Sequence, residues 1–359
     1  MVLTGLDVMA QREFRELAGR KFALLCNQAS IGRECEHIIS LVQKRGLKPS
    51  AIFGPQHGLY GHTQDNMIEW EGSADGEIPI YSLYGKTRKP TPEMLDGIDV
   101  LVIDLQDVGA RYYTFIWTIA LCLHACGDAG VKVLVLDRRN PLGGIIVEGA
   151  PQQPGFESFV GLHPIPIRHG KTVGELARQF RDIYYPACEV EVVEMQGWNR
   201  EMLWPHTGLP WGMPSPNMPT ADTSLIYPGG CLLEATNISE GRGTTRPFEI
   251  FGAPWIEAET LVRRLQDHAL PGVFFRPLEF QPTFNKYVGE LCRGAFVHVV
   301  DPEVFQPVGT YETIIREIRR AHPEQFRWKL PPYEYEWEKM PIDILHGSEF
   351  FRREVDAMR

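Results

Sequence analysis

Long apolar segments are missing from this chain. Apolar runs such as those around Val100–Leu105 and Val131–Leu136 are far shorter than the roughly 20 residues that cross a bilayer as a helix. The first residues, MVLTGLDVMAQREF, also lack the basic region followed by an apolar stretch that marks a secretory signal. We therefore expect no membrane partner and a cytoplasmic location.

Positive charge is scarce, and closely spaced cysteine pairs are absent. The 359 residues include 36 Lys and Arg against 46 Asp and Glu, so the net charge is −10 and nucleic acid is not an expected partner. The seven cysteines form no C-x-x-C pair and have no histidine at zinc-finger spacing. This pattern is typical of reduced thiols in the cytoplasm, so we expect neither disulfides nor a bound metal. The oligomeric state stays open.

Three common active-site signatures are also missing. Gly54–Gly61 has the spacing G-x-x-x-G-x-x-G instead of the dinucleotide-binding G-x-G-x-x-G, and neither H-E-x-x-H nor G-x-S-x-G occurs. His169–Thr172 ends like a phosphate-binding loop, but Ile165 occupies the position of its first glycine. Thr172 and Glu175 instead have the spacing of a capping box at a helix start. We therefore expect no nucleotide cofactor.

Short apolar segments alternate with helical stretches through the first half of the chain. This alternation predicts parallel strands joined by crossover helices, and so an α/β fold with a Rossmann-like parallel sheet. The expected strands are Phe22–Cys26, Ala51–Phe53, Val100–Leu105, Val133–Asp137 and Val190–Glu194. The expected helices are Glu36–Lys44, Pro92–Leu95, Tyr113–Ala129 and Val173–Tyr184.

The last third of the chain predicts a second, smaller domain of the α+β class. Pro205–Gly230 is rich in proline, glycine and tryptophan without usable periodicity, which is typical of a long ordered connection. We therefore predict a Rossmann-like catalytic domain at 1–228 and an auxiliary domain at 229–359. The expected elements of the latter are helices at Ala258–His268 and Tyr311–Ala321 and strands at Val273–Phe280 and Gly294–Val300.

Polar side chains follow four successive strands of the predicted sheet. Ligands of an open parallel sheet bind outside the carboxyl ends of its strands, so these residues are candidates for one pocket. For any single residue the alternative is a loop cap or an Asx-turn. The candidates are Asn27 and Gln28; Gln56 and His57; Asp104, Gln106, Asp107, Arg111 and Tyr112; and Asp137, Arg138, Arg139 and Asn140.

Two further segments, 147–170 and 236–249, combine fixed turns with acidic and basic side chains. A guanidinium binds a carboxylate through two parallel hydrogen bonds, so such segments suit an anionic polar ligand. In the second segment the alternative is a loop network in which the glutamates pair with the arginines. The side chains concerned are Glu148, Arg168, His169, Glu240, Arg242, Arg246 and Glu249.

A series of motifs runs along nearly the whole chain: FGPQHGLYG, YSLYGKTRKPTPEML, IDLQDVGARYYTFI, VLDRRNPLGG, VEG, FVGLHPIPIRHGKTVGELA, WGMPSPNMPT, YPGGCLLEATNISEGRGTTRPFEIFGAPWI and MPIDILHGS. Together they resemble the NamZ-type exo-β-N-acetylmuramidase family of glycoside hydrolases. The resemblance implies a Rossmann-like N-terminal domain, a smaller C-terminal domain and no metal or organic cofactor. It also implies release of N-acetylmuramic acid from the non-reducing end of peptidoglycan fragments.

Gln56 departs from the family pattern. The motif after the second strand is Gly-Pro-Glu-His-Gly in the family, with the Glu regarded as catalytic, and this chain has Gln56 there. Glycoside hydrolysis generally uses two carboxyl groups, and a carboxamide has no titratable proton. One hypothesis is an altered mechanism in which the substrate's own acetamido group is the nucleophile. The alternative is a catalytically silent protein that binds muropeptides or sugars.

The strand ends and the resemblance together give the predicted site. His57, Asp107 and Glu148 are expected to carry protons or charge in catalysis, His57 because its reference pKa of about 6.5 is close to neutrality. The residues expected to bind a muropeptide or a related amino-sugar glycoside are Gln56, Arg111, Tyr112, Arg138, Asn140, Arg168, His169, Glu240 and Arg242.

Overall fold

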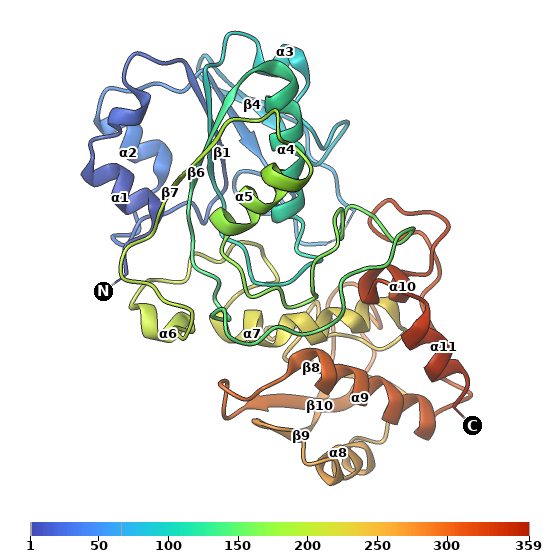
Figure 1. Cartoon of the computed structure of the whole chain (residues 1–359). Helices are drawn as coiled ribbons and strands as arrows, with labels where there is room; N and C mark the ends of the chain where they lie inside the picture. Colours follow the sequence, from blue (N-terminus) through green and yellow to red (C-terminus); the bar gives the residue numbers. More distant parts are fainter. Residues whose placement is uncertain (1, 66, 359) are drawn as a thin grey trace. The chain divides into compact units, whose positions relative to one another are not determined.

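The computed structural model describes residues 2–65 and 67–358, which form two compact units (Figure 1). The first unit consists of the stretch up to Gly109, Tyr113–Ile146 and Gly170–Pro216. The second consists of Ala110–Tyr112, Val147–His169 and the stretch from Asn217 onward. Each unit thus combines separate stretches of sequence. The split that we predict between residues 228 and 229 stays a prediction.

A mostly parallel sheet is the centre of the first unit. In the described residues it has seven strands in the order β3-β4-β2-β1-β5-β6-β7, and β3 runs antiparallel to β4. The strands are β1 (Phe22–Cys26), β2 (Ala51–Gly54), β3 (Ser73–Asp75), β4 (Ile78–Ser82), β5 (Val100–Asp104), β6 (Lys132–Leu136) and β7 (Val190–Val193). The predicted Rossmann-like sheet is therefore confirmed, although β3 and β4 were not predicted.

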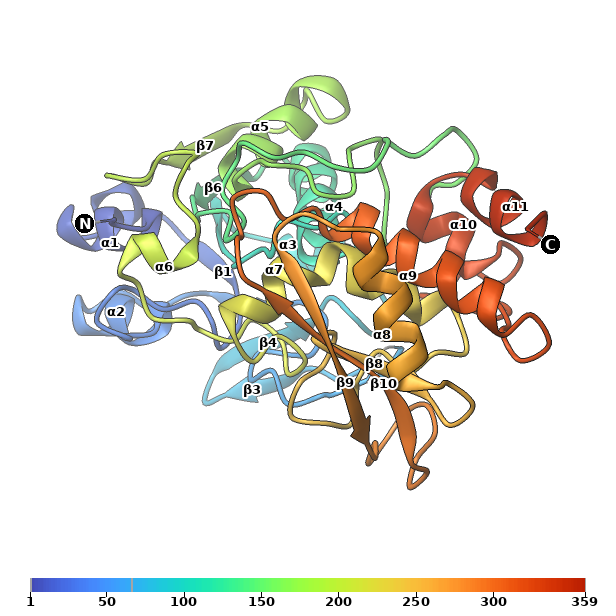
Figure 2. The ribbon, with the colours of Figure 1, turned by 90° about the horizontal axis from the view of Figure 1, so that it is seen from below.

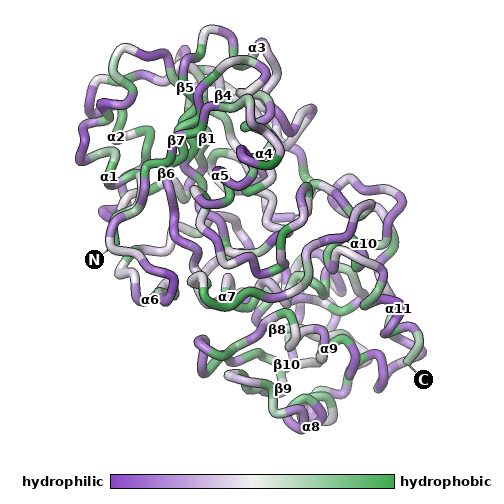
Figure 3. The backbone as a smooth tube through the Cα atoms, viewed as in Figure 1, coloured by the Kyte–Doolittle hydropathy of each residue, from purple (hydrophilic) through white to green (hydrophobic). Residues whose placement is uncertain are grey.

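Helices cover both faces of this sheet, which explains why its central strands are apolar without alternation. Helices α1 (Gly5–Gln11) and α2 (Ile38–Lys44) lie on one face, and α4 (Phe115–Ala129) and α5 (Val173–Ile183) lie on the other (Figure 1). The hydrophobic strands between them are the green stretches of Figure 3. At the start of α5, Thr172 and Glu175 form the predicted capping box.

The order of the strands reverses at β1, which defines where a ligand can bind. From β1 the chain continues to β2 on one side and later returns to β5 on the other. Open α/β sheets bind ligands in the crevice outside the carboxyl ends of strands at such a switch point. Cys26 of β1 pairs with Asp104 of β5, so the loops that follow both strands start from the same edge. We call this the carboxyl edge.

Short helices complete the first unit. They are η1 (Arg15–Leu17), α3 (Pro92–Leu95) and α6 (Trp204–Thr207). No helix among the described residues has both the length and the apolar character that crossing a bilayer requires.

The second unit contains a small antiparallel sheet covered by helices. Its strands lie in the order β8-β10-β9, and α8 packs against β9 and β10 (Figures 1 and 2). The predicted smaller α+β unit is thereby confirmed. Its elements are α7 (Ala221–Gly230), η2 (Cys231–Ala235), β8 (Ile250–Ala253), α8 (Ala258–Asp267), β9 (Val273–Phe280), β10 (Cys292–Val299), α9 (Pro307–Ala321), α10 (Pro341–His346) and α11 (Phe350–Asp356).

The prediction of a long ordered connection at Pro205–Gly230 is wrong for Ala221–Gly230, which form helix α7. Thr220 caps this helix through a hydrogen bond from the Thr223 backbone N–H. Gly229 lies where a Cβ would stand only 2.0 Å from the carbonyl oxygen of Pro307, the first residue of α9. Glycine therefore serves close helix packing here, whereas in the sequence it indicated a loop.

Candidate functional site

The loop after β2 holds Gln56 and His57 in a tight turn. The Trp70 indole N–H donates to the carbonyl of Pro55 at 3.0 Å, and a Cβ on Gly54 would meet the Trp70 ring at 2.6 Å. His57 itself adopts a φ of 68°, which is uncommon for a residue with a side chain. Such conformations persist where the surrounding structure fixes them, and they cluster at functional sites.

Gln56 lies in a hydrogen-bonded cage. Its side chain is only 4% exposed, its Nε2 donates to the Tyr84 hydroxyl at 3.1 Å, and its Oε1 accepts from the Thr114 hydroxyl at 2.5 Å. Both partners are hydroxyl groups, which can donate as well as accept. The same cage can therefore hold a carboxylate of the same shape. The sequence analysis missed Tyr84 and Thr114, although both lie in the motifs that carry the family resemblance.

The hydrogen bond to Thr63 defines the tautomer of His57. His57 Nδ1 lies 2.6 Å from the Thr63 carbonyl oxygen, which can only accept. The Nδ1 atom therefore carries the proton, and in the neutral ring the lone pair lies on Nε2. A neutral imidazole held in this tautomer can accept a proton from water or from a hydroxyl group.

Asp107 and Asn140 lie next to each other at the carboxyl edge. Asp107 Oδ2 accepts from the Gly109 N–H at 2.7 Å, and a Cβ on Gly109 would stand 2.5 Å from Asn140 Oδ1. Asn140 Oδ1 accepts from the Leu142 N–H at 2.9 Å, and its Nδ2 donates to the Lys171 carbonyl at 3.1 Å. Both residues thus make the local turn contacts that were the alternative to binding.

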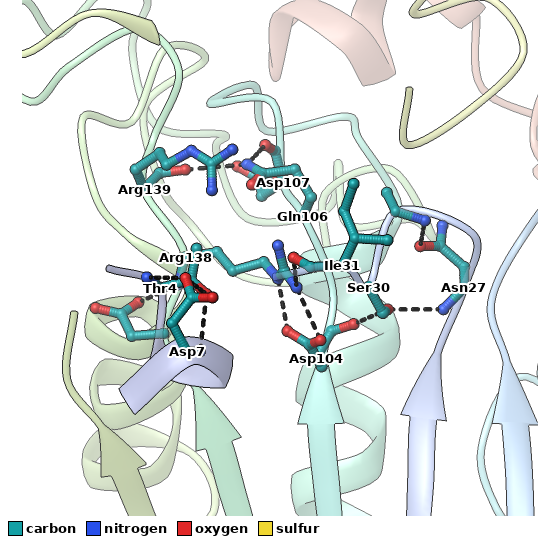
Figure 4. A network of polar contacts seen from close by, with 12 residues as sticks. Thr4, Asp7, Asn27, Ser30, Ile31, Asp104, Gln106, Asp107, Arg138 and Arg139 are labelled. Atoms are coloured by element: carbon teal, nitrogen blue, oxygen red, sulfur yellow. Dashed lines mark hydrogen bonds and ion pairs between the residues drawn. The ribbon is translucent and has the colours of Figure 1, made fainter. Parts of the chain in front are cut away.

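Arg138 is paired internally. Its Nε and one terminal nitrogen contact the two Asp104 carboxylate oxygens at 2.5 and 2.8 Å, and the same terminal nitrogen donates to the Ile31 carbonyl at 3.1 Å (Figure 4). The side chain is 1% exposed. This pair joins the loops after β1, β5 and β6, because Asp104 also accepts the Ser30 hydroxyl through its backbone carbonyl.

In the second unit, Glu148 and Arg168 form a pair. Their backbones exchange hydrogen bonds, their side chains approach to 3.5 Å, and the other Glu148 oxygen accepts from the Val308 N–H at 3.2 Å. Burial raises the pKa of Glu148 despite the nearby guanidinium, and burial likewise lowers the pKa of Arg168. A carboxyl group with a raised pKa keeps its proton closer to neutrality, as a general acid requires. His169 follows in the chain and is buried.

Arg111 and Tyr112 bind backbone carbonyls within the second unit. Arg111 donates to the carbonyl oxygens of Ala150, Ile165 and Leu345 at 2.7 to 2.8 Å. Burial lowers its pKa to about 10. The Tyr112 hydroxyl donates to the carbonyl of Pro228. These contacts tie together segments that are distant in sequence, and binding of a sugar by either residue stays a prediction.

Three buried charges and the half-buried Lys286 form a second group in this unit, which we call the Arg242 cluster: Glu234, Glu240, Arg242 and Lys286. Arg242 lies 2.8 Å from Glu234 and 3.4 Å from Glu240, and Lys286 lies 2.8 Å from Glu240. Burial raises the pKa of Glu234, but the charge of Arg242 and the hydrogen bonds from Arg242 and Tyr333 together outweigh it, so that the pKa is lowered. These contacts are the loop network of ion pairs that the sequence left as an alternative.

The predicted site residues divide between the two units. Gln56, His57, Asp107, Arg138 and Asn140 belong to the first unit, and Arg111, Tyr112, Glu148, Arg168, His169, Glu240 and Arg242 belong to the second. Their roles toward a substrate stay predictions. Among residues 2–65 and 67–358, no group of three or more His, Cys, Asp or Glu side chains is arranged to hold a metal ion.

A mostly parallel sheet with buried amide, imidazole and guanidinium groups at its carboxyl edge defines a Rossmann-like α/β protein. Two family models match the chain: the N-terminal model of exo-beta-N-acetylmuramidase NamZ at residues 22–222 and its C-terminal model at residues 225–359. The chain therefore belongs to the NamZ family.

Relatives of known name or structure agree with this assignment. The chain is 43% identical over 330 residues to peptidoglycan beta-N-acetylmuramidase NamZ of Bacillus subtilis, which covers 91% of this chain and 80% of that protein. A crystal structure of a DUF1343 family protein from Bacteroides fragilis superimposes with a TM-score of 0.90 at 33% identity, covering 99% of this chain and 91% of that one. A second such protein from this organism has a TM-score of 0.74 at 24% identity over the same shares, and this supports the fold alone.

Proposed function

We propose that this chain is a glycoside hydrolase that releases N-acetylmuramic acid, or a related amino sugar, from the non-reducing end of peptidoglycan fragments. The observation that carries the proposal is the 43% identity to the Bacillus subtilis β-N-acetylmuramidase over 91% of this chain. Its partner is then a small carbohydrate fragment. A cytoplasmic location stays a prediction from the sequence.

The proposed mechanism accounts for a carboxamide at position 56. The acetamido oxygen of the substrate attacks the anomeric carbon and forms a bond to it as the bond to the leaving oxygen breaks. Gln56, oriented by Tyr84 and Thr114, binds the acetamido group. Glu148, whose pKa burial raises, protonates the leaving oxygen.

Water completes the proposed reaction. It attacks the anomeric carbon, and the bond from that carbon to the acetamido oxygen breaks. His57 accepts the proton of this water, since its Nε2 holds the lone pair in the tautomer that Thr63 imposes. The Asp107 carboxylate stabilises the positive charge that develops on the sugar.

The test is hydrolysis of a chromogenic N-acetyl-β-muramide by the full chain. We expect turnover above buffer for the wild type. Gln56→Glu tests the role of the carboxamide, because it changes one atom of the caged side chain. Gln196→Glu is the matched control, since it adds the same charge at an exposed position of the same unit.

Two outcomes decide the proposal. Turnover by the wild type and by Gln196→Glu supports a hydrolase that works with Gln56. No turnover by the wild type together with activity gained in Gln56→Glu contradicts it, because a missing carboxyl group costs about 10²–10⁴ in rate. The silent sugar-binding protein would then be the better description.

A further inference from the structure

Two consecutive arginines at the carboxyl edge differ in their ion-pair contacts. Arg138 and Arg139 follow β6, and both are buried, at 1% and 3% exposure. The guanidinium of Arg138 lies against Asp104 (Figure 4). Arg139 forms no ion pair with any carboxylate among the described residues, and its Nε is buried without a hydrogen-bond acceptor there. Burial, and next the charge of Arg138, lower the pKa of Arg139 well below its usual value.

Trp204 fixes the orientation of this guanidinium. The central carbon of the Arg139 guanidinium lies 3.5 Å from the centroid of the Trp204 ring, so the two planar groups are in face contact. Trp204 is held in turn, because its indole N–H donates to the Leu209 carbonyl at 3.1 Å and its ring contacts the edge of Trp211 at 4.6 Å. The N–H groups of a guanidinium lie in its plane, so stacking on one face leaves them available to an acceptor at the edge.

Gln106 contacts the backbone of Arg139. Its Nε2 donates to the backbone carbonyls of Asp107 at 2.6 Å and of Arg139 at 3.0 Å, which ties the loops after β5 and β6 together (Figure 4). Its Oε1 is buried without a donor among the described residues. Buried polar groups in native proteins are almost always paired, so an unpaired guanidinium nitrogen and an unpaired amide oxygen on two loops that Gln106 ties together call for a ligand.

We propose that Arg139 is the anion-binding residue of the carboxyl edge and binds the carboxylate of the lactyl group on the muramic acid ring. The inference rests on the proposed function for the identity of the sugar. A carboxylate is planar and has two acceptor oxygens, which suits the in-plane donors of a stacked guanidinium. Gln106 Oε1 then accepts a hydroxyl proton of the same ligand. Arg138 takes no part, because its Nε and one terminal nitrogen already donate to Asp104 and to the Ile31 carbonyl.

The experiment compares N-acetylmuramic acid with its lactyl carboxamide, which has the same shape and no charge. Dissociation constants of both compounds are measured by calorimetry for the wild type, Arg139→Gln and Arg20→Gln. We expect the wild type to prefer the acid by about 10- to 100-fold, as one charge-assisted hydrogen-bonded pair provides. Arg139→Gln abolishes this preference. Arg20→Gln, which removes an exposed charge of the same unit, retains it.

Other results overturn the inference. The inference is overturned if Arg139→Gln still binds the acid more tightly than the carboxamide. It is also overturned if the wild type binds both compounds equally. Should the Gln variant fail to fold, Arg139→Lys serves instead. Because lysine keeps the charge but not the planar pair of donors, we expect it to reduce the preference only in part. If Arg139→Lys prefers the acid as strongly as the wild type does, the proposed bidentate contact with the carboxylate is contradicted.

The proposed function is judged separately, by hydrolysis. If binding of the acid depends on Arg139 but the wild type shows no turnover, the inference holds and the proposed function is wrong. If Arg139→Gln hydrolyses a muramide with an unchanged KM, the proposed function holds and the inference is wrong.

Discussion

The carboxyl edge of the first unit and the Arg242 cluster of the second both contain buried arginines, but the arginines are partnered differently. In the cluster, Arg242 lies against two glutamates, and Glu240 also pairs with Lys286. At the carboxyl edge, Arg139 stacks on a tryptophan face and forms no ion pair among the described residues, although the charges of Asp7 and Asp104 act on it without such a contact. The comparison teaches that burial alone does not mark a binding residue, whereas burial with an unmet charge does.

The largest expected effect separates the two kinds of buried glutamate. Glu148, whose pKa is raised by burial, is the proposed proton donor, whereas the pKa of Glu234 in the cluster is lowered. Glu148→Gln should reduce kcat by about 10²–10⁴-fold. In the wild type, kcat should fall as the pH rises through the elevated pKa of Glu148, because only the protonated form donates.

The pH profile of kcat for the wild type, Glu148→Gln and Glu157→Gln measures this effect. Glu157 is exposed and belongs to the same unit, so its variant is the control. An alkaline fall in kcat that persists unchanged in Glu148→Gln would assign the proton donor to another group.

The free energy of unfolding should distinguish the buried Arg242 from the buried Arg139. Arg242→Leu removes the ion-pair partner of the buried Glu234 and one of the two partners of Glu240, which costs about 3–5 kcal/mol. Arg139→Leu removes a buried charge that forms no ion pair in the described residues and should change the free energy of unfolding by less than about 1 kcal/mol. Urea unfolding of both variants measures the difference. Equal losses in the free energy of unfolding would show that Arg139 and Arg242 are held by comparable interactions.

Asp137, at the end of β6, gives the smallest expected effect. Burial raises its pKa to about 6, although the Gly174 and Arg138 N–H groups and the Thr172 hydroxyl hydrogen-bond to it. The folded state therefore holds this proton more tightly than the unfolded state. Stability should fall by roughly 1–3 kcal/mol as the pH rises from about 4 to about 6, and it should stay lower above that range.

The control for this titration is Asp137→Asn, which keeps an acceptor for the same donors and carries no charge. Thermal unfolding followed from pH 4 to pH 8 should show no such loss in the variant. If the wild type and Asp137→Asn change in parallel, another group causes the pH dependence.

Much of the fold follows from local pattern. The strands β1, β2, β5 and β6 occur where the sequence predicts them because each contains a short apolar run, and such runs are the signature of a sheet buried on both faces. The peripheral strand β3 is fully exposed and lacks this signature, so it was missed. Helix α7 was missed for a different reason, since Pro228 and Gly229 are tolerated there only because α9 packs against it.

The candidate site could be predicted only in part. The strand ends identified the loops that gather at the carboxyl edge, because parallel strands place their carboxyl ends together. The choice between Arg138 and Arg139 could not be made, since consecutive residues project in different directions and only the tertiary structure shows which one meets Asp104. Binding of a substrate by Arg138 stays a prediction, and the role proposed above belongs to its neighbour Arg139.

The most direct test uses the disaccharide in which N-acetylmuramic acid occupies the non-reducing end and N-acetylglucosamine the reducing end. The wild-type chain is incubated with it, and the products are identified by mass spectrometry. Our account predicts free N-acetylmuramic acid and free N-acetylglucosamine in equal amounts. An intact disaccharide, recovered from protein that binds it, would contradict a hydrolase and leave a sugar-binding protein.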